Sequence, residues 1–407
     1  MGYSIDYNMD YGRDYNIDYE LIRRDFPLIQ KKKIYMNNGA VALTPISTIK
    51  AITDFILKCS EEGPTSESIE EYITKLTKEL RIRLTHLINC QPEEIVFTQS
   101  TTEGINYISN GIEWKKGDSI VIRGASNEHY ANYLPWLYLS KRKGVKILEL
   151  NVDDNGYFEL GDLERSVKKQ NSIKLITLSH ALYNNGAIMP VEEVGKIAKE
   201  NNILYCLDSA QTIGSLEADV RKIGCDFMAF PGFKWLCGPL GIGVFYCNKN
   251  FAELLSPQNI GRESVSMTSD NESIFYSQLP NKFEAGFRNY PGIAGMESSL
   301  RYILRLGVSN IRKKNIAVAQ VIKDELAKIP SLKIYGPEDQ SSRTSIVSFS
   351  STNVDAKTIV DKLQQNEIIL AQREIGYDTK VVRASPHFFN SEEEAENVVR
   401  YVGSILK

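Results

Sequence analysis

Two stretches of this chain decide its fold: Leu207-Asp208-Ser209-Ala210-Gln211 and, further along, Phe230-Pro231-Gly232-Phe233-Lys234-Trp235-Leu236. In the first, an acid closes an apolar run, and in the second a lysine follows a glycine turn. Such a pair suits one cofactor, pyridoxal phosphate (PLP). The carboxylate of Asp208 keeps the pyridine nitrogen protonated so that the ring withdraws electrons, and Lys234 forms the Schiff base and then shuttles protons.

The surroundings of these stretches predict an α/β fold. Short apolar runs, each expected to be a buried strand, alternate with segments of helical period such as 191–201. The runs lie at 94–97, 121–122, 145–147, 175–178, 203–207 and 227–230. Such alternation predicts a large domain with a mostly parallel sheet and helices on both faces. Ligands bind outside the carboxyl ends of these strands, where both stretches fall.

A second, smaller α+β domain is expected towards the end of the chain. After Pro291 the helical pattern continues, and it is followed by a mixture of helical and strand-like segments. Helices are expected at 311–329, 355–366 and 391–406, and strands at 333–335 and 344–349. Two earlier helices are predicted at 45–60 and 66–88. A chain of 407 residues is long enough for two such domains.

The composition argues against several classes of protein. Hydrophobic residues make up 42% and charged residues 24%, which is ordinary for a soluble globular chain. A net charge of −3 gives no indication of a nucleic-acid or membrane-surface partner. No apolar run reaches the ~18 residues of a membrane span, and we expect no signal peptide. The six cysteines form no disulfide or metal pattern, so we expect no metal site and a reducing, cytoplasmic location.

The chain opens with an unusual repeat of acidic and aromatic residues. The pairs Asp6-Tyr7, Asp10-Tyr11, Asp14-Tyr15 and Asp18-Tyr19 recur every four positions. We expect residues 1–20 to form a flexible, weakly ordered acidic tail. The alternative is a tail that docks on a partner.

Three further segments carry groups that suit an amino acid and a phosphate. Residues 98–106 offer hydroxyls and amide donors at a helix start, where phosphates bind, although a simple Ser/Thr cap with a nearby glutamate explains the same pattern. His129 presents a flat imidazole in Asn127-Glu128-His129-Tyr130-Ala131-Asn132. Arg383 offers a planar guanidinium fork for a substrate carboxylate, in Val382-Arg383-Ala384-Ser385-Pro386-His387-Phe388-Phe389-Asn390.

Together these motifs resemble the class V aminotransferase family of PLP-dependent enzymes, in its cysteine desulfurase and selenocysteine lyase-like branch. The likeness extends over nearly the whole chain and implies the PLP-dependent transferase fold type I. It also implies that the small domain takes both chain ends, so that 21–35 joins 288–407 while 36–287 form the large domain. A small amino-acid substrate is implied, and a homodimer with active sites at its interface.

The resemblance implies roles for the residues around PLP. Lys234 and Asp208 are the expected catalytic pair, and His129 is expected to stack on the cofactor ring and to take part in catalysis. Gln211 matches the family residue that hydrogen-bonds the phenolic oxygen of PLP.

The phosphate and substrate positions also have counterparts in the family. Thr101 and Thr102 fall on its phosphate-contacting positions. Arg383 occupies the place of its carboxylate-binding arginine. Asn38, in Tyr35-Met36-Asn37-Asn38-Gly39-Ala40, lies in the segment that lines the same pocket.

Two departures from the family pattern concern the phosphate. Pro231 and Phe233 stand where many members have a serine and a histidine that bind it. The family's Gly-Thr-Pro-Asn loop, which reaches the phosphate of the partner subunit, reads Gly286-Phe287-Arg288-Asn289. We therefore expect Arg288 to supply a replacement charge across a dimer interface. Tyr183 also replaces a cofactor-contacting asparagine.

A third departure concerns the reaction. A cysteine desulfurase takes sulfur from its substrate on a loop cysteine of the small domain. The corresponding stretch, 369–377, contains no cysteine, and none occurs after Cys247. Arg373 lies there instead and is expected to contact the substrate or a second anionic group. Cys237, close to Lys234, is expected to serve packing.

The sequence therefore predicts a PLP enzyme that acts on an amino acid, with carbon–sulfur bond cleavage of a cysteine-like substrate as the leading hypothesis and no persulfide cysteine. An aminotransferase and an amino-acid epimerase are alternatives, because they use the same residues. A non-catalytic binding homologue is the third alternative.

Overall fold

The computed structural model describes residues 17–124, 128–267, 273–376 and 378–407. The three Asp–Tyr pairs before residue 17 lie outside the described residues. The fourth pair is helical, since the Asp18 carboxylate accepts a hydrogen bond from the backbone N–H of Leu21 and caps α1 (Tyr19–Arg23). Tyr19 packs against the largest apolar cluster. The flexible tail that we expected for 1–20 therefore does not include residues 17–20.

A seven-stranded sheet forms the centre of the large domain in the described part of the chain. Its strands, in spatial order, are β2 (Ile95–Thr98), β8 (Gly243–Cys247), β7 (Phe227–Pro231), β6 (Leu204–Asp208), β5 (Ile173–Ser179), β3 (Ser119–Arg123) and β4 (Lys146–Leu150). Only β8 runs antiparallel to its neighbours among these strands, so the sheet is mostly parallel, as the sequence predicts.

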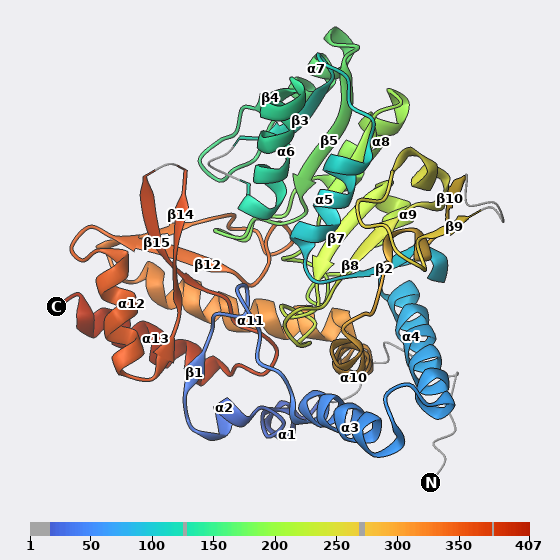
Figure 1. Cartoon of the computed structure of the whole chain (residues 1–407). Coiled ribbons are helices and arrows are strands. Elements are labelled where there is room, and N and C mark those ends of the chain that lie inside the picture. The colour runs from blue at the N-terminus through green and yellow to red at the C-terminus, as the bar shows by residue number, and fades with distance from the viewer. Residues whose placement is uncertain (1–16, 125–127, 268–272, 377) are drawn as a thin grey trace.

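Helices cover both faces of this sheet (Figure 1). One face packs on α5 (Thr101–Gly111) and α6 (Tyr130–Lys143). The other face packs on α4 (Glu67–Ile88), α7 (Leu160–Lys169), α8 (Val191–Glu200), α9 (Val220–Ile223) and α10 (Tyr290–Leu306). Along β6, Cys206 faces the first cluster and Leu207 the second, since successive side chains of a strand point to opposite faces. Burial on both faces explains why this strand reads as a continuous apolar run.

The small domain has a four-stranded antiparallel sheet, seen at the left of Figure 1. Its order is β11 (Leu332–Tyr335), β12 (Val347–Ser351), β15 (Thr379–Ala384) and β14 (Ala371–Ile375). Its helices are α11 (Val308–Ala327), α12 (Ala356–Gln365) and α13 (Glu392–Ile405). The apolar side chains of α10 pack in the large cluster, and the small cluster begins in α11. The domain limits stay a prediction; α11 contributes to both clusters, with Ile311 in the large one and Val318 in the small one.

The segment after α1 connects the two ends of the chain. It continues through α2 (Pro27–Gln30) to β1 (Ile34–Tyr35), which pairs in parallel with β13 (Ile368–Ile369) of the small domain. Helix α3 (Ile46–Glu62) then packs against α10. Shorter elements are a hairpin of β9 (Val265–Met267) and β10 (Ile274–Tyr276), and the 3-10 turns Pro92–Glu94, Lys249–Leu254 and Asn281–Phe283.

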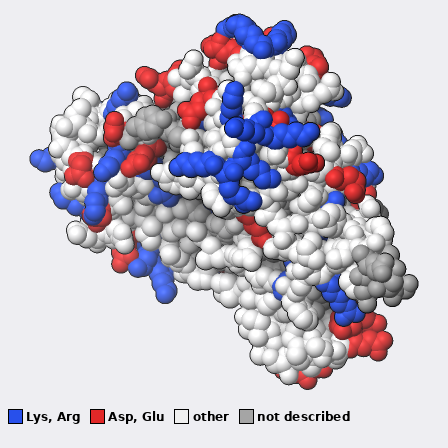
Figure 2. Space-filling model, turned by 45° about the horizontal axis from the view of Figure 1, so that its top comes forward, with Lys and Arg blue, Asp and Glu red and all other residues white. Residues whose placement is uncertain are grey.

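The surface carries both signs of charge. Figure 2 shows one face on which basic side chains gather near the centre, with acidic side chains scattered around them. None of the helices in the described residues is both long enough and apolar enough to cross a membrane.

Candidate active site

The strand ends of the large sheet place Asp208 and Lys234 at the same edge. Asp208 is the last residue of β6, and Lys234 follows the end of the neighbouring strand β7 by three residues. Asp208 Oδ1 accepts a hydrogen bond of 2.9 Å from the N–H of Ala210, which holds the carboxylate at the strand end. The carbonyl of Asp208 accepts a bond from the N–H of His180 on the adjacent strand end, at 2.8 Å.

A tight loop carries Lys234. The N–H of Cys237 donates to the carbonyl of Lys234 at 2.8 Å, and the N–H of Gly238 donates to the carbonyl of Gly232 at 2.9 Å. A Cβ at Gly232 would lie 3.1 Å from Ile242 Cγ2, so a larger residue there would require a small shift of Ile242. The left-handed backbone falls instead on Cys237, with φ of 55°, and its thiol is fully buried. Burial of this thiol raises its pKa, so Cys237 is held as a neutral packing group.

The electrostatics of Lys234 and Asp208 are coupled. Burial lowers the pKa of Lys234 to about 8, the charge of Asp208 opposes this shift, and the guanidinium groups of Arg383 and Arg373 add to it. Burial raises the pKa of Asp208 to about 6, against the effects of the Ala210 N–H and of Lys234. A lysine with a lowered pKa is partly neutral near pH 8 and is therefore a nucleophile and a base.

The start of α5 contains a helix cap and, beside it, a free hydroxyl. Ser100 Oγ accepts from the N–H of Glu103 at 3.4 Å, and Glu103 Oε2 accepts from the N–H of Gln99 at 2.6 Å. The Oγ1 of Thr101 is buried and has no partner in the described part of the chain, whereas Thr102 is exposed. The cap therefore uses Ser100 and Glu103 and leaves the hydroxyl of Thr101 available to a ligand, so the phosphate role of this segment stays a prediction.

His129 is the N-cap residue of α6. Its Nδ1 accepts from the N–H of Ala131 at 3.1 Å, and its ring meets that of Tyr183 edge-on, with centroids 5.0 Å apart. Burial, together with the positive charges of Lys234, Arg383 and Arg373, lowers the pKa of His129 to about 4. The imidazole is therefore neutral, as stacking on a cationic pyridine ring requires. Residues 125–127 lie outside the described residues.

The residue before His129, Glu128, has a buried carboxylate with several polar partners. The carboxylate of Glu128 accepts from Ser179 Oγ at 2.6 Å and from Asn132 Nδ2 at 3.1 Å, and it lies 3.7 Å from the guanidinium of Arg123. Since both ionic side chains are fully buried, this pair fixes the segment that carries His129.

Arg383 is a buried cation on β15 without a described acidic partner. Its Nη1 donates to the carbonyl of Tyr183 at 2.7 Å and its Nη2 to Asn37 Oδ1 at 3.1 Å, while its Nε has no partner among the described residues. Burial and the charge of Arg373 lower its pKa to about 9. Asn38, the residue that we expected in this pocket, donates instead to the carbonyl of Ser385 at 2.9 Å.

The small-domain segment that carries Arg373 is a short hairpin. Arg373 lies on β14, which pairs with β15 as far as Ile375 and Thr379, so only residues 376–378 connect the two strands. The Nη1 of Arg373 donates to the carbonyl of Gln372 at 2.6 Å. Of the six cysteines, five are buried and Cys59 is partly buried on α3. No thiol of the described chain is therefore placed on this hairpin.

Gln211 and Arg288 are both engaged within the chain. Gln211 Nε2 donates to the carbonyl of Gly39 at 2.9 Å, which leaves one N–H of this amide. Arg288 Nε lies 4.0 Å from Glu284 Oε2, and its buried Nη2 has no partner in the described residues. Arg288 lines the same surface pocket as Gln99, in the expected phosphate segment.

The residues present fit PLP. An unpaired buried hydroxyl at a helix start suits the phosphate, a buried carboxylate at a strand end suits the pyridine nitrogen, and a lysine with a lowered pKa suits the aldehyde. The unpaired N–H of buried Arg383 suits a substrate carboxylate.

Sequence reasoning missed some contacts of this site. Asn37, not its neighbour Asn38, meets Arg383, although both were in the quoted segment. Tyr183 contributes its backbone carbonyl, for which no side-chain signal exists. Glu128 had a usable signal, since it directly precedes His129 in the same motif.

Comparisons with known proteins show the family of this chain. Residues 34–398 match the family model described as aminotransferase class-V. The chain therefore belongs to the class V aminotransferase family of PLP-dependent enzymes. The family, the fold type and the PLP cofactor inferred from the sequence are confirmed.

Its relatives narrow the branch. A probable cysteine desulfurase of Methanothermobacter thermautotrophicus is 32% identical over 393 residues, which are 93% of this chain and 95% of the relative. One of Pyrococcus abyssi is 33% identical, over 95% of this chain and 98% of the relative. The apo structure of a cysteine desulfurase from Thermococcus onnurineus NA1 is similar, with a TM-score of 0.88 at 30% identity, covering 95% of this chain and 98% of that one.

Proposed function

We propose that this enzyme cleaves the carbon–sulfur bond of a cysteine-like amino acid and releases the sulfur group directly, without a persulfide on the protein. The observation that carries the proposal is the convergence of Lys234, Asp208 and Arg383. The charges of Asp208 and Arg383 shift the pKa of Lys234, and the charge of Lys234 shifts the pKa of Asp208. Similarity to proteins named as cysteine desulfurases supports the choice of substrate class. The cysteine-free hairpin of Arg373 supports release without a protein persulfide.

Each residue of the site has a separate role in this proposed reaction. When bound, PLP supplies an electron sink for negative charge at the α-carbon of the amino acid. Asp208 holds the proton on the pyridine nitrogen, and Arg383 binds the substrate carboxylate through its guanidinium fork. The neutral amine of Lys234 takes the proton from the α-carbon. The flat imidazole of His129 covers the cofactor ring.

We assign the remaining expected residues to supporting roles in the same proposal. Thr101, with Thr102 at the same helix start, binds the phosphate. Gln211 donates its remaining N–H to the phenolic oxygen of PLP. Asn38 holds the pocket wall through Ser385, and Arg373 binds a second anionic group or the carboxylate beside Arg383.

We further propose a cytoplasmic homodimer in which Arg288 completes the phosphate site of the partner subunit. The unpaired Nη2 of Arg288 supports this, as does its neighbour Phe287, which is 94% exposed in the single chain. The absence of any disulfide among the six cysteines is compatible with a reducing compartment.

Product analysis tests the reaction. The purified chain with PLP is incubated with L-cysteine, L-cystine and a cysteine S-conjugate, and K234A serves as the control. Direct release predicts pyruvate and ammonia together with an equal amount of sulfide from L-cysteine, cysteine persulfide from L-cystine or free thiol from the conjugate. One water is consumed per turnover, and K234A gives no product.

Other products would identify the alternatives. Alanine with transferable sulfur would mean desulfuration by another acceptor and would overturn the proposal. Racemised amino acid would indicate an epimerase, and a product that forms only when a keto acid is added would indicate an aminotransferase. PLP bound without turnover of any amino acid would indicate a binding homologue.

A further inference from the structure

His387 belongs to the small domain but contacts the loop of the large domain that carries Lys234. It lies three residues beyond the end of β15 and is fully buried. Its Nε2 is 3.1 Å from the carbonyl oxygen of Trp235, the residue after Lys234. The two rings also pack edge to face, with centroids 5.1 Å apart at 84°. A single imidazole therefore holds both the backbone and the side chain of Trp235.

The surroundings of His387 define which nitrogen carries its proton. Its Nδ1 lies 3.3 Å from Asn315 Oδ1, while the Nδ2 of Asn315 has no partner among the described residues. Turning this amide by half a rotation exchanges its oxygen and nitrogen, so that Nδ2 of Asn315 donates to Nδ1 of His387. The imidazole is then neutral, accepts at Nδ1 and donates from Nε2 to Trp235. Burial lowers the pKa of His387 to about 3, in agreement with a neutral ring.

The bond to Trp235 closes a circuit of hydrogen bonds. Trp235 Nε1 donates to Gln211 Oε1 at 3.0 Å, and Gln211 Nε2 donates to the carbonyl of Gly39 at 2.9 Å. The N–H of Gly39 donates to Ser385 Oγ at 3.0 Å, and Ser385 precedes His387 by two residues. A Cβ at Gly39 would lie 3.3 Å from Gln211 Oε1, so only glycine fits this link without a shift. The circuit joins the N-terminal segment to both domains around the lysine loop.

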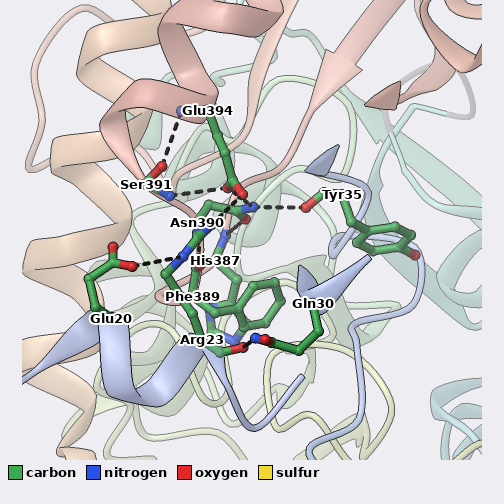
Figure 3. Close-up of polar contacts among 9 residues, drawn as sticks. All are labelled: Glu20, Arg23, Gln30, Tyr35, His387, Phe389, Asn390, Ser391 and Glu394. Atoms are coloured by element: carbon green, nitrogen blue, oxygen red, sulfur yellow. Dashed lines mark hydrogen bonds and ion pairs between the residues drawn. The ribbon is translucent and has the colours of Figure 1, made fainter. Parts of the chain in front are cut away.

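The segment of His387 is itself anchored, as Figure 3 shows. The N–H of His387 donates to Asn390 Oδ1 at 2.9 Å. Asn390 Nδ2 donates to the carbonyl of Tyr35 at 3.1 Å and to Glu394 Oε2 at 2.9 Å. Glu394 in turn pairs with Arg23 at 2.8 Å. These bonds fix the His387 segment relative to β1, α13 and α1, and Arg383 lies four residues before His387 on β15.

We propose that His387 is a positioning residue that fixes the loop of Lys234 relative to Arg383 by donating a hydrogen bond to the carbonyl of Trp235. Arg383 and His387 lie four residues apart on one anchored segment. The bond therefore sets the position of the amine relative to the carboxylate receptor. His387 acts through Trp235 and not on the reacting atoms. The inference rests on the roles of Lys234 and Arg383 proposed above.

Three variants of the full-length chain separate the hydrogen bond from packing. H387F keeps a ring but removes the donor, and H387Q replaces the donor with an amide N–H. F389L, in the same aromatic cluster, removes packing without touching the bond to Trp235. Hydrogen exchange of the peptide that spans 232–238 is measured before and after removal of PLP. Retention of PLP on Lys234 is measured by borohydride reduction and mass spectrometry.

In H387F we expect the backbone amides of the loop to exchange hydrogen about tenfold faster. We also expect the protein to retain PLP about tenfold more weakly, as the loss of one buried hydrogen bond implies. H387Q restores both to within about threefold, and F389L lowers thermal stability without changing either. Unchanged loop exchange in H387F would overturn the proposal. The proposal would also be overturned if H387Q changed loop exchange and PLP retention as much as H387F does. The same holds if F389L, at matched stability, changed them as much as H387F does. If K234A retained PLP covalently, the proposed function would fail, whereas the exchange data would still test His387.

Discussion

At the scale of single residues, burial sets the chemistry of this site. Lys234 has a lowered pKa because its amine is removed from water and lies near two guanidinium groups, and Asp208 only partly opposes this. The same burial leaves Arg383 as a cation whose described partners are a carbonyl and an amide oxygen. An active site with positive charge in excess is suited to a ligand that brings a phosphate and a carboxylate.

The lowered pKa of Lys234 predicts how PLP capture depends on pH. Only the neutral amine attacks an aldehyde, so the capture rate of cofactor-free protein falls about tenfold per pH unit below about 8 and levels off above it. Burial of the amine sets this midpoint first, and the charged groups that modify it are Asp208, Arg383 and Arg373. Stopped-flow absorbance of PLP at a series of pH values measures it. A rate still rising at pH 10 would show an ordinary lysine.

Arg383 predicts a selective loss of carboxylate binding. R383A is expected to raise the KM for the amino acid by about 100-fold, as the loss of charged hydrogen bonds implies, and R383K by about tenfold, because a lysine keeps the charge but not the fork. Steady-state kinetics measures both. A substrate analogue that lacks the carboxylate is the control, and an equal rise in its KM would contradict this role.

At the scale of elements, the N-terminal helix α1 clamps the small domain. Arg23 donates to the carbonyl of Phe389 at 2.7 Å and to Glu394 at 2.8 Å, and both Arg23 and Glu394 are largely buried. Glu394 also caps α13 through Ser391. The first described helix is therefore part of the packed structure, in contrast to the tail that we expected up to residue 20.

This clamp predicts a difference between two neighbouring variants. R23A leaves the largely buried Glu394 without its cationic partner and is expected to lower the free energy of unfolding by ~2–3 kcal/mol. E20A removes a carboxylate that is 80% exposed and is expected to cost less than ~0.5 kcal/mol. Urea unfolding followed by circular dichroism measures both. Similar losses in the two variants would show that Arg23 contributes little to the fold.

At the scale of the whole molecule, the unpaired Nη2 of Arg288 and the exposed Phe287 support the proposed second subunit. We expect the chain to sediment at twice its 46.0 kDa mass. R288A is expected to weaken PLP binding about tenfold, by loss of a charge-assisted bond to the phosphate, with the dimer intact. R301A, which changes an exposed arginine on α10, is the control. Unchanged PLP affinity in R288A, by fluorescence titration, would remove Arg288 from the phosphate site.

The elements and the main site residues were accessible from local sequence. Buried parallel strands are short continuous apolar runs, and the residues at their carboxyl ends reach one edge of the sheet whatever the details of packing. For this reason Asp208 and Lys234 could be predicted from the order of residues, and their roles stay a prediction. The domain limit was harder to place, because α10 packs against α3 and α4, which are distant in sequence.

The contacts that set the positions and the pKa values of the site residues could not be predicted from local sequence. Asn37, Tyr183 and His387 act on residues 150 or more positions away, so no local spacing predicts them. A pKa depends on burial and on the charges that gather around a group, and both are properties of the packed chain. The order of residues thus defines which chemistry is available, because side-chain type and strand position are local. The tertiary structure defines the relative positions and the pKa values of these groups, because it joins three distant segments around Lys234.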